Sequence, residues 1–493
     1  MVLKWAAAMG LAALTAGCAS TQPQSAQGPK NILLFVADGM GINTMTAARI
    51  FAVGEEGQLA LDALPEAAYV KTYSANMQAS DGAAAMSAYL SGEKTANGVL
   101  AMSDCGTPQA RPVPTLLELA KQRGLAAGIV SNGSVTDAFS AAGYFHHCPS
   151  SLRPAASATG SQARAASASA SDGAVVQRAH PASEQMTAQV WPMAEQAQLA
   201  AAALVPGGAG YNAALGSGLD VVLGGGAREF RQRADGRDLL SEMRARGYAQ
   251  PTNPAELNAL KPAAGQRLLG LFADEALATD TARDASRQPS LAQMTQRAIA
   301  GLSSNGKGFL LVVGNRHIEK ALADSSARTA LEEVQALDQA LQAAIDDMQR
   351  RDPGLKNTLI VATSTHDSTL VLNGYSRRTG KTTAQEPGVL GLLKRYGDGK
   401  PGKDLDGASY TIIGFGSGGK RVQGPRSSGP ALDDATVSAS GYAQEAVVRT
   451  APGSATPGGT DVWLGAIGAR AEDFRGTIDN TRVFNLIRNA AGW

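Results

Sequence analysis

Short apolar segments that recur between amphipathic helical stretches constrain the fold of this chain more than any other feature. They are NILLFVADGMG (31–41), LAAGIVSN (125–132), LDVVLGGG (219–226), GFLLVVG (308–314) and TLIVATSTH (358–366). Strands that are apolar on both faces lie in sheets that are covered on both sides, and such sheets are mostly parallel. The sequence therefore predicts an α/β fold with a mostly parallel central sheet that helices cover on both faces.

The size and charge of the chain fit a large folded domain that has no nucleic-acid partner. Its 493 residues are 44% hydrophobic, and 44 Lys and Arg residues nearly balance 43 Asp and Glu residues, so nothing favours a polyanionic ligand. We expect residues 31–493 to form one domain. Within it, an Ala/Ser-rich stretch near 153–185 is expected to be a surface insertion. A Gly/Pro/Ser-rich region near 374–459 is expected to form loops over one end of the sheet.

The N-terminal segment has the pattern of a bacterial lipoprotein signal. Lys4 precedes an apolar run at 5–14, and small residues lead from this run to Cys18. We predict a signal peptide over 1–18, a polar tether over 19–30, and a lipid on Cys18 that anchors the protein to a membrane. Ala19 favours the outer membrane, on the periplasmic side of the cell envelope. The run is too short for a transmembrane helix, and the alternative is an ordinary secretory signal with an unmodified cysteine.

The two other cysteines, Cys105 and Cys148, then remain as a pair in an oxidising compartment. A disulfide between them would close a loop of about 40 residues and contribute roughly 4 kcal/mol in the chain-entropy model. Two free buried thiols are the alternative. We predict the disulfide.

Polar residues that directly follow the apolar segments are expected to share one cleft. In open α/β sheets, ligands bind beyond the carboxyl ends of the strands, which places Asp38, Asp81, 314–319 and 365–366 together. Asp38 is a candidate metal-bridging carboxylate, or it caps the turn that follows its strand. Asp81 stands where a helix N-cap would stand. The next residue, at the position of a nucleophile, is Gly82.

Six segments resemble, in their order and spacing, blocks of the alkaline phosphatases. They extend from residue 31 to about 487 and are NILLFVADGMG, SDGAAAMSAYLSGEKTANG, GLDVVLGGG, GFLLVVGNRHIEKALA, TLIVATSTHDSTLVLNGY and GGTDVWLGAIGARAEDFRGTIDNTRVF. The resemblance implies an alkaline-phosphatase-like fold and two-metal phosphoryl transfer. In that mechanism zinc activates a serine, an arginine binds the phosphoryl oxygens and a magnesium supports the water step. The resemblance also suggests a homodimer.

The resemblance implies that the nucleophile and most metal ligands of the family are replaced here. The serine nucleophile falls on Gly82, and the magnesium-binding Glu falls on Gly314. Two zinc-binding His residues fall on Ala323 and Pro457, and a zinc-binding Asp falls on Thr365. Glu319 stands at the position of another zinc-binding Asp, and His366 is intact. The site therefore keeps only part of its donor set.

The stretch VSNGSVTDAFSAAGYFHHCPSS, at 130–151, keeps one position of the magnesium shell. Asp137 matches that position, but the threonine expected two residues later is Phe139, and the phosphate-binding arginine falls on Ser150 or Ser151. Zinc needs about four donors, and a catalytic site supplies three from the protein. The remaining positions are too few, so we expect no tight zinc or magnesium and at most weak binding of a divalent metal. These residual positions are Asp38, Asp137, Glu319 and His366.

We therefore interpret the chain as a lipoprotein of the alkaline phosphatase type that has lost catalysis, a pseudophosphatase. One alternative is a phosphomonoesterase with a rearranged or metal-poor site. A relocated hydroxyl such as Ser80, which is expected to point away from position 82, would then have to serve as nucleophile. Another alternative is a periplasmic anion-binding or interaction module that uses the backbone N–H groups after Asp81. The sequence identifies no protein or ligand partner.

Overall fold

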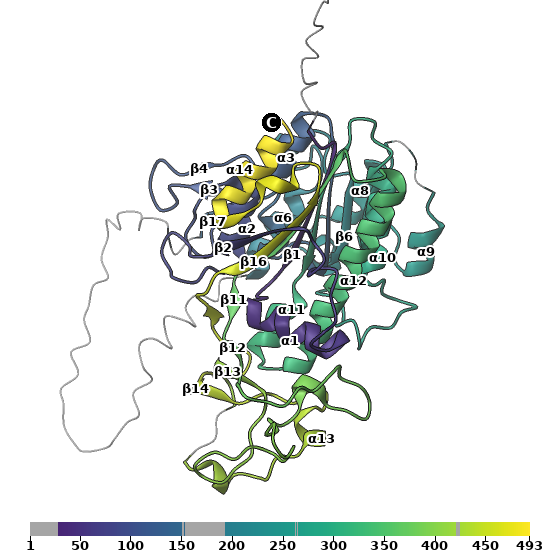
Figure 1. Ribbon diagram of the computed structural model, residues 1–493. Helices are drawn as coiled ribbons and strands as arrows, with labels where there is room; N and C mark the ends of the chain where they lie inside the picture. Colours follow the sequence, from purple (N-terminus) through teal and green to yellow (C-terminus); the bar gives the residue numbers. More distant parts are fainter. Residues whose placement is uncertain (1–27, 150–151, 153–192, 262, 264, 421–423) are drawn as a thin grey trace, which may run out of the picture.

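The computed structural model describes residues 28–149, 152, 193–261, 263, 265–420 and 424–493 (Figure 1). The expected signal peptide with Cys18, most of the tether, Ser150 and Ser151, and the insertion near 153–185 lie outside these residues, and the statements about them stay predictions. Among the residues that the structure describes, no helix is both long and apolar enough to cross a bilayer.

A ten-stranded sheet forms the centre of the molecule. Its strands are β1 (Asn31–Ala37), β2 (Glu66–Lys71), β5 (Ala126–Ser134), β6 (Val221–Gly225), β7 (Tyr248–Ala249), β8 (Arg267–Leu271), β9 (Phe309–Asn315), β10 (Thr358–Ser364), β16 (Val462–Gly468) and β17 (Gly476–Asp479). They lie in the order β17-β2-β16-β10-β1-β9-β5-β6-β8-β7. Only β16 runs antiparallel to its neighbours β10 and β2. The expected mostly parallel α/β sheet is confirmed.

The register of the central strands brings the functional positions side by side. In β1, Ala37 pairs with Asn315 of β9 on one side and with Ser364 of β10 on the other. Every residue of β9 and β10 is buried, which explains why their sequences are apolar without alternation. The residues that follow these three strands therefore emerge next to one another at the carboxyl edge of the sheet.

The two faces of β1 point into two separate cores. Ile32, Leu34 and Val36 belong to one core, and Leu33 and Phe35 belong to the other, because successive side chains of a strand point to opposite faces. Helices close the first core over one face of the sheet and the second core over the other (Figure 1). The first set is α2 (Gly82–Ser91), α3 (Leu116–Gln122), α6 (Met193–Ala203) and α14 (Asn480–Ala490); the second is α1 (Ile42–Val53), α10 (Leu291–Leu302) and α12 (Ala327–Arg351).

Shorter elements lie in the connections between these strands and helices. The α-helices are α4 (Ala138–Ala141), α7 (Ala227–Arg231), α8 (Leu239–Ala245), α9 (Pro254–Ala259), α11 (His317–Ala323) and α13 (Asp434–Val437). The 3-10 helices are η2 (Ala213–Leu215), η3 (Gly388–Leu390), η4 (Arg426–Ser428) and η5 (Ala471–Asp473). The short strands are β3 (Met102–Ser103), β4 (Arg111–Pro112), β11 (Asp367–Ser368), β12 (Leu370–Leu372), β13 (Ile413–Gly418), β14 (Ala446–Arg449) and β15 (Pro457–Gly458).

The segment between β10 and β16 forms a small separate layer of structure. Its strands β12, β13 and β14 make a three-stranded sheet, and β11 pairs with β15. Figure 1 shows this segment below the main sheet, past helices α1 and α11, at the end where β1 and β10 terminate. The pairing of β11 with β15 places Pro457 opposite Ser368, and so returns a distant part of the chain to the functional cleft.

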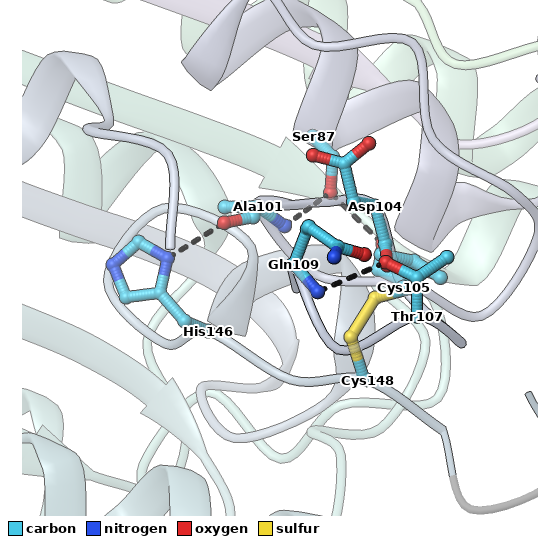
Figure 2. Close-up of a disulfide and its surroundings, with 9 residues drawn as sticks. Ser87, Ala101, Asp104, Cys105, Thr107, Gln109, His146 and Cys148 are labelled. Carbon is cyan, nitrogen blue, oxygen red and sulfur yellow. Dashed lines mark hydrogen bonds between the residues drawn. A yellow bond between two sulfur atoms is a disulfide. The ribbon is translucent and has the colours of Figure 1, made fainter. Parts of the chain in front are cut away.

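The predicted disulfide is confirmed, and the alternative of two free thiols is wrong. Cys105 and Cys148 are bonded through their sulfur atoms, with 5.6 Å between their Cα atoms (Figure 2). Next to the bridge, the backbones of Leu100 and His147 pair, and the Nδ1 atom of His146 lies 2.8 Å from the Ala101 carbonyl oxygen. The disulfide therefore fastens a loop that backbone pairing already positions.

Candidate functional site

The cleft lies where strands β1, β9 and β10 end and where helix α2 begins. Asp38 follows β1, Arg316 follows β9, and Thr365 follows β10. Gly82 is the first residue of α2. A Cβ atom built on Gly82 would lie 3.3 Å from each carboxylate oxygen of Asp38. The structure therefore brings the expected nucleophile position directly against Asp38, and that position carries no side chain.

The carboxylate of Asp38 is buried and fully engaged by protein groups. It is 1% exposed. The Thr365 hydroxyl donates to its Oδ1 over 2.6 Å, and Arg316 Nη1 lies 2.9 Å from its Oδ2. His366 Nε2 lies 3.7 Å from Oδ1. Asp38 thus faces the cleft as expected, but its two oxygens are held by a hydroxyl and a guanidinium.

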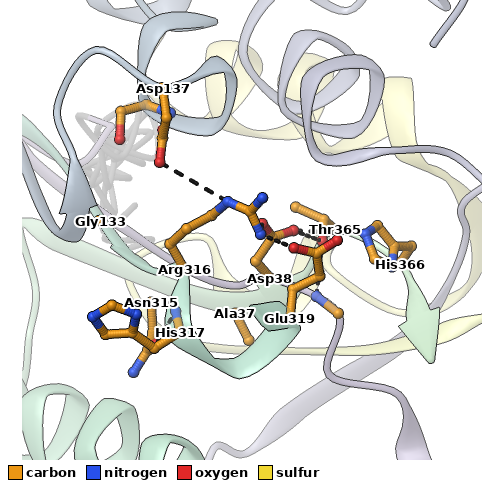
Figure 3. A network of polar contacts seen from close by, with 12 residues as sticks. Ala37, Asp38, Gly133, Asp137, Asn315, Arg316, His317, Glu319, Thr365 and His366 are labelled. Carbon is orange, nitrogen blue, oxygen red and sulfur yellow. Dashed lines mark hydrogen bonds and ion pairs between the residues drawn. The ribbon is translucent and has the colours of Figure 1, made fainter. Parts of the chain in front are cut away.

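Arg316 lies among three carboxylates (Figure 3). The same Nη1 atom that contacts Asp38 also forms an ion pair with Glu319 Oε2, and Arg316 Nε lies 3.9 Å from Asp137 Oδ2. Sequence reasoning did not identify this residue. The available signal was its position, since Arg316 is the one arginine within 314–319, a stretch that was expected at the cleft.

Buried amides hold the backbone that presents Arg316. Its N–H donates to Asn132 Oδ1 over 2.8 Å, and the side-chain amides of Asn132 and Asn315 both donate to Glu333 Oε2. Burial raises the pKa of Glu333 to about 7, even though hydrogen bonds from the Asp280 N–H and the Asn315 amide favour its ionised form. This polar cluster fixes the turn from β9 into α11.

An aromatic ring fills the space next to position 314. Asp137 caps helix α4 by accepting a hydrogen bond from the Ser140 N–H over 2.9 Å, and this short helix carries Phe139, which is 3% exposed. A Cβ atom on Gly314 would lie only 2.1 Å from Phe139 Cε1. Gly314 and Phe139, two positions at which the resemblance implies other residues, therefore fit each other. Burial also raises the pKa of Asp137 to about 6, against the opposing effect of Arg316.

Asp81 caps the N-terminus of helix α2, which begins at Gly82. Its Oδ1 accepts from the Ala84 N–H over 2.8 Å and its Oδ2 from the Gly98 N–H over 2.7 Å, which makes it the expected N-cap. Burial raises its pKa, although both hydrogen bonds act in the opposite direction. The Ser80 hydroxyl is buried and has no hydrogen-bond partner among the described residues.

The remaining expected positions meet around one small cavity. It has a volume of about 10 Å³, room for one water molecule, and Glu319, Ala323, His366 and Pro457 are among the residues that line it. His366 Nδ1 lies 2.8 Å from the Asp367 carbonyl oxygen, and its buried Nε2 finds no hydrogen-bond partner in the part of the chain that the structure describes. The fold therefore gathers the residues that the resemblance assigns to zinc. Two of them, Ala323 and Pro457, offer no donor atom.

The donor set does not fit the zinc and magnesium of the family. Asp38 and Glu319 share one guanidinium nitrogen, and the Thr365 hydroxyl donates its hydrogen to Asp38 instead of supplying a carboxylate. The phenyl ring of Phe139 occupies the direction in which a side chain at position 314 would extend. Zinc requires about four donors and magnesium six, mostly oxygens. Among the described residues the remaining groups are too few for either ion, and Arg316 already contacts one oxygen each of Asp38 and Glu319.

Comparisons with known proteins agree with the fold and with the six segments. The family model described as "Alkaline phosphatase" matches residues 29–172 and 155–493. An alkaline phosphatase of Gadus morhua is 29% identical over 94% of this chain and 91% of its own length. A streptomycin-6-phosphate phosphatase of Streptomyces griseus is 30% identical over 84% of this chain and 92% of its own length.

Solved structures of alkaline phosphatases share the architecture. The Thermus thermophilus enzyme superposes with a TM-score of 0.61 at 23% identity and covers 98% of this chain and 96% of its own. A variant of the TAB5 alkaline phosphatase with magnesium bound in its M3 site superposes with a TM-score of 0.62 at 20% identity, over 95% of this chain and 99% of its own. The shared fold thus extends over almost the whole chain.

Proposed function

We propose that this chain, which belongs to the alkaline phosphatase family, is a pseudophosphatase that keeps the fold and has lost phosphoryl transfer. The observation that carries the proposal is the pair of groups at Asp38. Where the family places a nucleophilic serine there is Gly82, whose Cβ direction points at both Asp38 oxygens. Where metal ions would contact Asp38 there is the guanidinium of Arg316, 2.9 Å from Oδ2.

The alternative of a rearranged hydrolase is opposed by the burial of its two candidate nucleophiles, Thr365 and Ser80. The Thr365 hydroxyl has a potential base beside it, because it donates to Asp38 over 2.6 Å. It also accepts a hydrogen bond from the Gly39 N–H over 3.0 Å and is 0% exposed. A nucleophile has to reach the phosphorus atom, so a hydroxyl enclosed in this way cannot attack a substrate. Ser80 is also fully buried.

The alternative of an anion-binding module is opposed by the charge of the cleft. Asp38, Asp81, Asp137 and Glu319 bring four carboxylates toward it, and Arg316 supplies one fixed positive charge against them. At the start of α2, the Ala84 N–H that a phosphate would use already donates to Asp81. A phosphate group would therefore meet net repulsion.

The proposal retains the cellular context that the sequence suggests. The signal-like segment 1–18 and its closing cysteine support a lipid on Cys18 and a location on the periplasmic side of the envelope, anchored to the outer membrane. A Cys18→Ser variant should leave the membrane fraction or stay unprocessed. Unchanged fractionation would rule out lipidation as the anchor. A homodimer, as the resemblance suggests, is tested by light scattering of the purified protein.

A direct assay tests the loss of catalysis. Purified protein, supplied with zinc and magnesium, should hydrolyse an aryl phosphate no faster than an Asp38→Asn variant prepared in the same way. The variant is the matched control because a contaminating phosphatase would appear equally in both preparations. Hydrolysis that is present in the natural protein, absent in Asp38→Asn and abolished by a chelator would overturn the proposal.

A further inference from the structure

We infer that Arg316 is a built-in counter-cation: its guanidinium takes the place of divalent metal in this cleft, neutralises the converging carboxylates and makes the fold independent of metal. The inference deepens the proposed function and rests on it for the loss of the metal site. It concerns what replaces the metal ions, a point that the loss of ligands alone leaves open.

The carboxylates in the cleft create an electrostatic need. Asp38 is almost completely buried, and the side chains of Asp137 and Glu319 are 17% and 29% exposed. Ionised carboxylates that leave water require a positive partner or hydrogen-bond donors, or they take up protons instead. In the family, metal ions meet this need. In the described residues of this cleft, side chains have to supply the positive charge that balances these carboxylates.

Arg316 meets this need with its planar guanidinium. An arginine stays protonated in proteins and presents several N–H groups in a fixed plane. Its Nη1 contacts both Asp38 and Glu319, and its Nε faces Asp137. Figure 3 shows the guanidinium extended between these carboxylates. One side chain therefore links the ends of β1, β5 and β9, as a bound ion would.

The backbone around Arg316 is adapted to this placement. A Cβ atom on Gly133 would lie 2.9 Å from Arg316 Cβ and 2.9 Å from Asp137 Oδ2, so only a glycine leaves room for the arginine to pass β5. The backbone N–H of Arg316 donates to the side chain of Asn132, the residue that precedes Gly133. The side chain thus follows a path that β5 and β9 leave open, with 32% of its surface exposed.

Metal and guanidinium compete for the same oxygens. Arg316 Nη1 contacts Asp38 Oδ2 and Glu319 Oε2, two oxygens that would otherwise be available to hold a divalent ion. Removing the arginine side chain would free these two oxygens. His366 Nε2, which has no hydrogen-bond partner among the described residues, lies 3.7 Å from the other oxygen of Asp38, Oδ1. The cleft would then have an acidic site of unsatisfied charge, the condition that favours a divalent cation.

The test compares metal binding and thermal stability of the natural protein with an Arg316→Gly variant. Zinc and magnesium are added separately, and a chelator provides the metal-free reference. The natural protein should show the same melting temperature in all conditions and retain no stoichiometric metal after dialysis. Arg316→Gly should melt lower in chelator, regain stability with a divalent ion and bind it roughly tenfold more tightly or better. Arg475→Gly, which removes an arginine from an exposed pair with Glu66, is the matched control and should show neither effect.

The outcomes separate the inference from the proposed function. A folded Arg316→Gly protein that gains no metal response overturns the inference and leaves the pseudophosphatase intact. A natural protein that binds stoichiometric metal and loses stability in chelator overturns both. If Arg316→Gly does not fold, Arg316→Met and the double variant Arg316→Met/Asp38→Asn decide: the second change should recover part of the lost melting temperature. Equal or lower stability of the double variant refutes the role of Arg316 as counter-charge.

Discussion

The fit between Gly314 and Phe139 makes a quantitative prediction about stability. A Cβ atom at position 314 would lie 2.1 Å from the nearest ring carbon of Phe139, whereas carbon atoms pack at about 3.5–4.0 Å. Strand β9 cannot retreat, because it is paired with β1 on one side and β5 on the other. The ring therefore has to move. We expect Gly314→Ala to cost about 3 kcal/mol of unfolding free energy, the upper end of typical overpacking effects.

The same contact predicts strong coupling between the two positions. Phe139→Ala alone removes a ring that is 3% exposed and should cost about 3–5 kcal/mol through lost burial and a residual cavity. In the double variant, the new methyl group at position 314 occupies space that the ring has vacated. The double variant should therefore be more stable than the two separate effects predict, by roughly 2 kcal/mol.

Urea unfolding of the four proteins, followed by fluorescence and circular dichroism, measures the coupling energy. Gly306→Ala is the matched control, because a Cβ atom there would meet nothing within 4 Å, and its effect should stay within about 0.5 kcal/mol. Additive behaviour of Gly314→Ala and Phe139→Ala within about 0.5 kcal/mol would refute the argument. It would show that the ring and the strand do not compete for this space.

Three further predictions concern charge, cross-linking and chemistry. Burial raises the pKa of Glu333 from 4.5 to about 7. The stability that this group contributes below about pH 4.5 therefore falls by roughly 3 kcal/mol as the pH rises through 7. The unfolding free energy of Glu333→Gln should lack that decline, and parallel pH profiles of the two proteins would contradict the prediction. Replacing Cys105 and Cys148 by Ser should lower the unfolding free energy by roughly 4 kcal/mol, measured with urea, and an unchanged midpoint would refute the estimate. Gly82→Ser should not restore hydrolysis of an aryl phosphate, since a serine there still lacks a metal activator; chelator-sensitive turnover would contradict this.

The strands and the gathering of the cleft could be predicted from sequence because both follow from local patterns. The apolar segments at β1, β9 and β10 have no polar alternation, and strands of this kind pair in parallel. Once they pair, their carboxyl ends coincide, so Asp38 and Thr365 were expected to meet, and a hydrogen bond of 2.6 Å joins them. The N-cap role of Asp81 is equally local, because it depends only on the helix that follows.

The two substitutions that reshape the cleft could not be predicted in the same way. The direction of the Arg316 side chain depends on the space that Gly133 leaves on a neighbouring strand, and sequence spacing does not record this. The contact of Phe139 with Gly314 is a match of volumes between positions far apart in the chain. Aligning each position separately identifies what is missing, whereas only the packed structure shows what has filled the vacated space.

The replacements in the cleft therefore act as a connected set and not as independent losses. Restoring donor atoms alone, through Gly82→Ser, Gly314→Glu, Glu319→Asp, Ala323→His, Thr365→Asp and Pro457→His, would set a glutamate against the Phe139 ring and add carboxylates around a guanidinium. A glutamate at position 314 has no room until Phe139 becomes smaller, and metal cannot reach Asp38 until Arg316 leaves Oδ2. Activity that depends on several groups acting together is not recovered by restoring one of them. Building a metal site in this cleft would thus require changes at Phe139 and Arg316 as well as at the donor positions.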